Sequence, residues 1–159
     1  MSTAVARRPD RWVLAGFLAL SALTAIVGGA ASGAGVRAWY LAMNQPPLSP
    51  PGWVFGPVWT LLYAAMAIAA WRVWRRVGAD RSIAVYLIQL ALNAAWSGLF
   101  FGARRMDLAL VDIVAMWILI AATIALFARR DRAAAWMMAP YLAWVSFATY
   151  LNAAFLALN

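Results

Sequence analysis

Five long apolar segments restrict this chain to an α-helical membrane fold. Each holds about 20 residues, the length that a helix needs to cross the hydrocarbon core of a bilayer. The mean hydropathy of +0.79 and the hydrophobic share of 67% lie far above those of a soluble domain. We therefore expect one all-α integral membrane domain over residues 1–159, a bundle of five transmembrane helices at residues 12–32, 51–72, 83–101, 108–127 and 133–158.

The residue types that are missing exclude most catalytic chemistry. The sequence contains no cysteine and no histidine, so it offers no thiolate nucleophile and lacks the commonest metal ligand and general base. We expect no catalytic residue of an ordinary kind, no metal site and no required cofactor. The net charge of +8 comes from 13 arginines and five aspartates. Because the arginines gather at the ends of the apolar segments, they indicate membrane topology and not nucleic-acid binding.

The arginines are distributed unevenly between the two sides of the expected bundle. Ten precede the first helix or lie in the connections at 72–81 and 129–132, and only Arg37, Arg104 and Arg105 lie on the other side. Arginine-rich segments stay in the cytoplasm. We therefore expect a cytoplasmic N-terminus and a C-terminus on the opposite side. The bacterial inner membrane is favoured over the outer membrane, which ordinarily holds β-barrels.

Small residues recur at every fourth position of the first apolar segment, at Ala25, Gly29 and Gly33. Such a face allows two helices to approach closely. It packs either inside the monomer or against a second copy of the chain, and we expect a homodimer.

A proline-rich loop, residues 44–51, separates the first two membrane segments. Proline fixes φ and disfavours a helix at the preceding residue, so this loop should be extended and stiff. Residues 36–43 before it are typical of a short interfacial helix. Four aromatic residues crowd the first turns of the helix that follows, and they form either the mouth of a cavity or an ordinary interfacial belt: Trp53, Phe55, Trp59 and Tyr63.

The third and fifth segments each carry a polar and aromatic face at helical spacing. Polar side chains in a membrane helix should point inward, where they join helices by hydrogen bonds or contact a ligand. Asp112 is the only acid well inside a segment, and we expect it to pair with Arg104 or Arg105. The two faces consist of Gln89, Asn93, Trp96 and Phe100, and of Tyr141, Trp144, Ala148, Asn152 and Phe155.

Aromatic faces with a few amides beneath a stiff loop suit a large, flat, mostly apolar ligand. Tetrapyrroles fit this description, and Arg37 is a candidate partner for their propionates. Without histidine or cysteine, strong ligation of iron is not expected, so a free porphyrin, or a haem held by its faces, is the favoured ligand.

Three sequence blocks form a pattern that covers nearly the whole chain beyond the first ten residues. They are Trp39-Tyr40 with Pro46-Pro47 and residues 50–63, Asn93-Ala94-Ala95-Trp96 with residues 100–104, and residues 140–152. Together they resemble the TspO family of tryptophan-rich sensory proteins, whose animal members are called translocator protein or peripheral-type benzodiazepine receptor.

The resemblance implies a receptor, sensor or transporter that binds protoporphyrin IX, haem-type tetrapyrroles and isoquinoline carboxamides. The binding cavity would lie under the loop between the first two membrane helices. The alternative that it implies is an enzyme that degrades protoporphyrin IX in light. The cavity would be lined by Trp39, Trp53, Trp59, Asn93, Trp96, Tyr141, Trp144, Phe147 and Ala148, and Asn152 shares the face of Trp144.

The chain departs from the family pattern at positions that bear on this ligand. Many members have a cation in place of Gln45 and a tryptophan in place of Leu48, and the fourth helix often has a tryptophan in place of Leu108. These changes reduce the expected porphyrin affinity. No cation follows Tyr150, so the sterol motif of the family is incomplete and we do not expect specific sterol binding.

Overall fold

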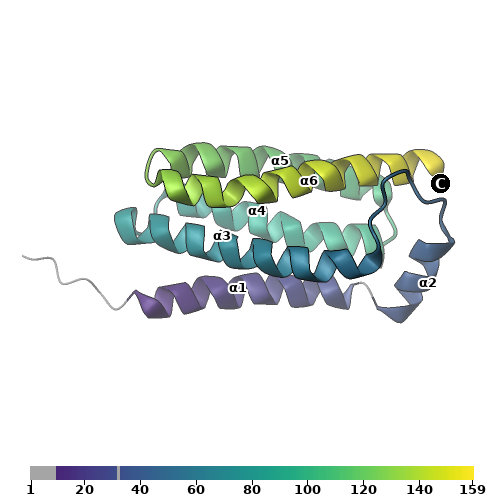
Figure 1. Cartoon of the computed structure of the whole chain (residues 1–159), viewed down its shortest axis with the longest axis horizontal. Coiled ribbons are helices and arrows are strands. Elements are labelled where there is room, and N and C mark those ends of the chain that lie inside the picture. The colour runs from purple at the N-terminus through teal and green to yellow at the C-terminus, as the bar shows by residue number, and fades with distance from the viewer. Residues whose placement is uncertain (1–9, 32) are drawn as a thin grey trace, which may run out of the picture.

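The computed structural model describes residues 10–31 and 33–159, and residues 34–37 by their backbone only. Every regular element in this part of the chain is helical, and five helices are long and apolar enough to span a membrane, which confirms the expected fold class. A 3-10 turn, η1 (Gly52–Val54), leads into the second long helix, and a π-helical turn, η2 (Gly98–Gly102), extends the third. The helices are α1 (Arg11–Ala30), the short α2 (Ala34–Ala42), α3 (Phe55–Val77), α4 (Arg81–Ser97), α5 (Met106–Ala128) and α6 (Arg132–Leu158) (Figure 1).

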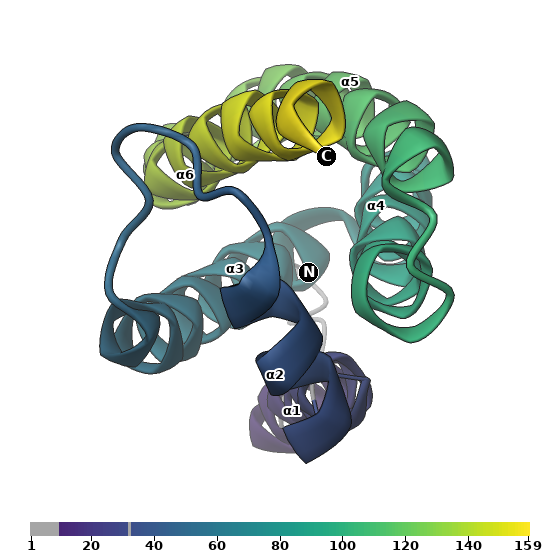
Figure 2. The ribbon, with the colours of Figure 1, turned by 90° about the vertical axis from the view of Figure 1, so that its right-hand side faces the viewer.

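The five long helices form a ring in the order α1, α3, α6, α5, α4 (Figure 2). Each packs against its two neighbours in this ring. Helix α2 and the proline-rich loop lie at one end, and the C-terminus lies at the same end. We call this the loop end, and the opposite end, where α3 ends and α6 begins, the arginine-rich end.

The outer surface of the bundle is apolar. Ile26, Leu61 and Val111 are 67%, 71% and 70% exposed. Burial of such side chains against hydrocarbon is favourable, whereas their contact with water would be costly. The ring therefore places its outward faces in lipid.

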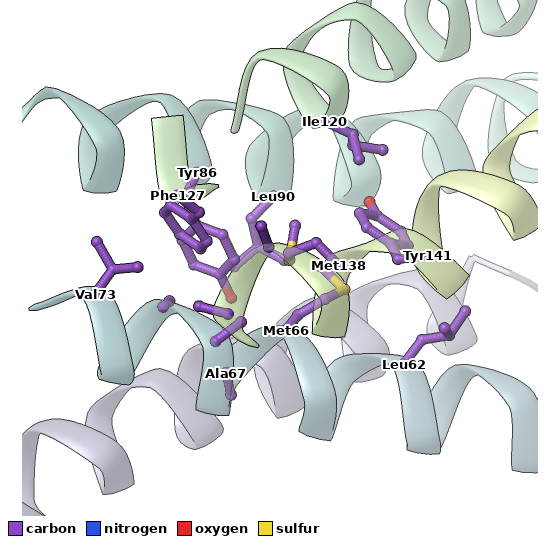
Figure 3. Packing of buried hydrophobic residues seen from close by; sticks show 14 of the residues in the cluster. Leu62, Met66, Ala67, Val73, Tyr86, Leu90, Ile120, Phe127, Met138 and Tyr141 are labelled. Atoms are coloured by element: carbon purple, nitrogen blue, oxygen red, sulfur yellow. The ribbon is translucent and has the colours of Figure 1, made fainter. Parts of the chain in front are cut away.

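Large side chains pack the interior of the ring (Figure 3). Met66, Tyr86, Phe127 and Met138 are fully buried, and the rings of Tyr86 and Phe127 stack at a centroid distance of 6.1 Å. Ala67 on α3 is also fully buried, and its small side chain allows neighbouring helices to approach.

Three aspartates precede helices at the arginine-rich end: Asp10, Asp80 and Asp131. Asp80 and Asp131 accept hydrogen bonds from the first backbone N–H groups of α4 and α6, as N-caps do. The Asp131 carboxylate also binds Arg72 and Arg76 of α3, at 2.9 and 3.2 Å. This carboxylate therefore joins the end of α3 to the beginning of α6.

Helix α3 continues past Arg72, where we expected the membrane segment to end, to Val77. Its last turns are held by charge contacts, since Arg75 binds Asp10 at 2.5 Å and lies over the ring of Trp71 at 4.9 Å. Long arginine side chains keep their charge in water while their stems cover apolar surface, so the helix can extend to the interface.

Two irregularities shape the other helices. Pro140 lies inside α6, which continues on both sides of it. In η2 the chain widens into a π turn, after which the N–H of Arg105 donates to the carbonyl oxygen of Leu99 at 2.9 Å. Such turns re-aim side chains and often occur at functional sites.

Candidate ligand site at the loop end

The proline-rich loop is tied to the C-terminal part of α6. The Asn44 N–H donates to the side-chain oxygen of Asn159 at 2.9 Å, and Asn159 Nδ2 donates to the Asn44 carbonyl oxygen at 3.2 Å. The Tyr150 hydroxyl donates to the carbonyl oxygen of Pro47 at 3.1 Å. These bonds hold the loop across one end of the ring, beside α6 (Figure 2).

Three aromatic rings from α3 and α6 meet below this loop. Trp59 stacks on Tyr63 with a centroid distance of 5.3 Å and an interplanar angle of 29°. Trp59 also meets Tyr141 edge-on at 6.2 Å. Aromatic pairs at these separations attract each other beyond the effect of burial alone. The structure thus brings the predicted site residues Trp59 and Tyr141 together.

A chain of hydrogen bonds links these aromatic residues to the amides of α4. The Tyr63 hydroxyl donates to Asn93 Oδ1 at 2.5 Å, Asn93 Nδ2 donates to the Tyr141 hydroxyl at 3.0 Å, and Tyr141 donates to Gln89 Oε1 at 2.9 Å. Tyr141, Gln89 and Asn93 are buried in the interior, where Figure 3 shows Tyr141. Gln89 and Asn93 therefore point inward as expected and join α3, α4 and α6.

A second aromatic group lies where α2 meets η2. Trp96 stacks on Phe100 at 5.2 Å, and Trp39 meets Phe100 edge-on at 6.3 Å. Trp96 Nε1 donates to Asn152 Oδ1 at 3.0 Å, and Asn152 Nδ2 donates to the carbonyl oxygen of Met106 at 2.9 Å. The predicted residues Trp39, Trp96 and Asn152 are thus brought together.

Trp144 lies in a third aromatic group beside the loop end. Phe55 meets Trp144 edge-on at 5.9 Å, and Phe147 lies 5.8 Å from Trp144. Trp144, Phe147 and Ala148 are half-buried, so the protein covers part of each side chain and leaves the rest accessible.

Trp53 is more exposed than the other tryptophans of the predicted site. Its side chain is 77% exposed in η1. Leu48 is 78% exposed, at a positive φ of 68°. The Gln45 side-chain amide forms a local hydrogen bond: its Nε2 donates to the carbonyl oxygen of Tyr40 at 2.7 Å. Leu108 is 43% exposed on α5.

The expected pairing of Asp112 with an arginine is wrong. Arg105 binds Asp107 instead, at 2.6 Å, and Arg104 lies over the ring of Trp39 at 5.4 Å. Asp107 is only two residues from Arg105 in the sequence, and both side chains are about half exposed. Among the described residues, Asp112 Oδ2 is buried without a hydrogen-bond partner, and so is Gln89 Nε2.

Four residues of these groups were absent from the predicted site: Phe55, Tyr63, Gln89 and Phe100. Tyr63 follows Trp59 by four residues, so the helical period could have identified it. Gln89 precedes Asn93 by four residues and shares its face. The side chain of Arg37, the candidate partner of propionates, lies outside the part that the structure describes.

The arrangement is suited to binding and not to acid–base chemistry. No group of three or more metal-binding side chains occurs in the described part of the chain. The polar groups here are amides and phenols, which orient a ligand by hydrogen bonds, while the indole and phenyl rings supply stacking surface.

The fold and this end of the ring define a class: an integral, multi-pass α-helical membrane protein with aromatic and amide side chains gathered at one end. The sequence profile of the TspO/MBR family matches residues 17–158, and the chain belongs to this family.

Individual relatives match over most of the chain. The translocator protein of Homo sapiens is 43% identical over 148 residues, covering 89% of this chain and 87% of that protein. The tryptophan-rich protein TspO of Chlorobaculum tepidum is 42% identical over 125 residues, covering 76% and 79%. The tryptophan-rich sensory protein of Cereibacter sphaeroides is 42% identical over 121 residues, covering 76% and 77%. Family membership supports a role as a membrane sensor or receptor.

Proposed function

We propose that this sensor or receptor binds a tetrapyrrole such as protoporphyrin IX, or another flat hydrophobic molecule, at the loop end of the ring. The observation that carries the proposal is the cluster of half-buried aromatic side chains beside buried amides. Trp59 and Trp144 offer ring faces for stacking, and Asn93 lies beside them in a network with Tyr63 and Tyr141.

A ligand at this position would lie beside the loop that α6 holds in place. The Asn44–Asn159 contacts are exposed and close to the C-terminus, so they can open without disturbing the packed interior. Exchange of a ligand through the loop end, as in a transporter, needs only such a local opening.

Titration of the purified chain with protoporphyrin IX tests the proposal. Bound porphyrin should quench tryptophan fluorescence, because Trp39, Trp59, Trp96 and Trp144 all lie at the loop end. Absence of saturable quenching would refute it.

Illumination of the same complex separates a sensor from an enzyme that degrades porphyrin in light. Tryptophans that stack on a porphyrin could also donate an electron to its excited state, so binding alone does not distinguish the two. We expect the porphyrin absorbance to decay at the rate found in detergent without protein. A faster decay that needs Trp144 would support the enzyme instead.

We propose further that the chain forms a homodimer through α1. Gly28 packs inside the monomer, where an added Cβ would lie 3.0 Å from Ser97 Oγ, whereas a Cβ at Gly29 would meet nothing within 4 Å. Ala25 and Gly29 are exposed on the outer face of α1. Gly29→Leu should shift the particle mass in detergent from dimer to monomer, and a wild-type monomer would contradict the proposal.

We propose that the arginine-rich end faces the cytoplasm of a bacterial inner membrane, and the arginine distribution supports this orientation. The described N-terminal residues and the connections α3–α4 and α5–α6 all lie at this end (Figure 1). A periplasmic reporter joined after Asn159 by a flexible linker should therefore be active. Activity of a cytoplasmic reporter at the same position would reverse the orientation.

A further inference from the structure

A groove runs between α5 and α6 on the outer surface near the arginine-rich end. Its volume is about 260 Å³, and its lining is apolar except for one arginine side chain. This is smaller than the roughly 300–1,000 Å³ of pockets that enclose drug-sized ligands, so a narrow occupant fits better than a flat macrocycle. The lining residues are Ile124, Ala128, Arg132, Ala135, Trp136 and Ala139.

The residues from α6 share one helical face. Arg132, Ala135, Trp136 and Ala139 are three or four residues apart, which places them one above another along the groove. The alanines leave a shallow floor, and Trp136, which is 76% exposed, forms a wall. Arg132 lies one helical turn closer to the water than Trp136. The groove is thus cationic at its outer end and apolar deeper in the membrane.

The charge of Arg132 is not neutralised by the acid beside it. Asp131 directs its carboxylate to Arg72 and Arg76 of α3, and Arg130 binds Asp80 at 3.4 Å. Among the described residues, no ion pair involves Arg132. An arginine guanidinium at the membrane interface is suited to bind a phosphate by paired hydrogen bonds.

We propose that this groove is a binding site for an anionic phospholipid. The headgroup phosphate binds Arg132, the first acyl segment lies along Ala135 and Ala139, and the indole of Trp136 packs against it at the depth where tryptophan is favoured. Basic pockets between membrane helices select anionic lipids in the same manner, through a cation at the interface and apolar surface below it.

Native mass spectrometry of the full-length protein in detergent tests the site, with phosphatidylglycerol and phosphatidylcholine of identical acyl chains as probes. Phosphatidylglycerol should be retained preferentially. Arg132→Gln should weaken that retention about fivefold, the effect of one interfacial cation. Trp136→Ala should also weaken it, and both side chains are exposed, so the variants should fold.

Arg81→Gln is the matched control, because Arg81 also follows a capping aspartate as the first residue of its helix but does not line the groove. It should retain the lipid as the wild type does. Equal retention of both lipids by the wild type, an equal loss in Arg81→Gln, or unchanged retention in Trp136→Ala would each overturn the site. Displacement of the lipid by equimolar inorganic phosphate would show that free phosphate is the ligand, and would overturn it too.

Discussion

Tyr141 connects three helices through one hydroxyl group. It accepts from Asn93 and donates to Gln89, and it is fully buried. A buried polar atom that loses its partner has no water to replace it, so the two amides depend on this hydroxyl. Through these bonds the amides link α4 to α6 across the interior of the ring.

Tyr141→Phe should therefore destabilise the protein although it removes a single oxygen atom. Two buried amide atoms would lose a partner, at a cost of about 1–3 kcal/mol. The melting temperature in detergent measures this loss. Tyr150→Phe is the control, since its hydroxyl makes one exposed bond to Pro47 and should matter far less. Equal melting temperatures for Tyr141→Phe and the wild type would show that the network contributes nothing to stability.

At the scale of elements, the arginine-rich end depends on one aspartate. Burial raises the pKa of Asp131, but hydrogen bonds from Arg72 and the Ala134 N–H, together with the charges of Arg72 and Arg76, hold that pKa below its usual value of 3.8. The ionised carboxylate is thus favoured by the folded state, and it connects α3 with α6.

This shift makes stability depend on pH in a defined direction. A carboxyl whose pKa is lower in the folded than in the unfolded protein stabilises the fold at a pH above its pKa in the unfolded state. This contribution is lost as the pH falls through the pKa of the folded state. Asp131→Asn keeps an N-cap acceptor but removes the charge. It should lower the melting temperature at pH 7 and flatten the acid side of the stability curve.

Asp107→Asn provides the comparison, because Asp107 and its partner Arg105 are both about half exposed, at 50% and 55%. Exposed ion pairs contribute little. The account would be contradicted if, below pH 4, the melting temperature of Asp131→Asn fell with pH as steeply as that of the wild type.

At the scale of the whole molecule, much of the fold follows from the sequence. The helix number and type follow from apolar segments of membrane-spanning length, and the inward faces of α4 and α6 follow from the spacing of their amides. These features depend on local periodicity, which a sequence carries directly.

Other features depend on contacts between distant segments. The helix order around the ring, the tie between Asn44 and Asn159, and the high exposure of Trp53 have no local signal. Asp112 shows the difficulty most clearly. Its nearest arginines in the sequence suggested an ion pair, but Asp107 competes for Arg105 from two residues away and Arg104 packs on Trp39.

The porphyrin affinity of Trp144 variants, measured by absorbance beside the melting temperature of the same preparation, tests the proposed ligand site most directly. An aromatic stack contributes about 0.5–1.5 kcal/mol beyond burial, so Trp144→Ala should weaken binding of protoporphyrin IX about tenfold, and Trp144→Phe much less. Trp136→Ala, at the opposite end of the ring, should bind porphyrin as the wild type does. An unchanged dissociation constant in Trp144→Ala, together with a lowered melting temperature, would contradict the account, because Trp144 would then be a packing residue only.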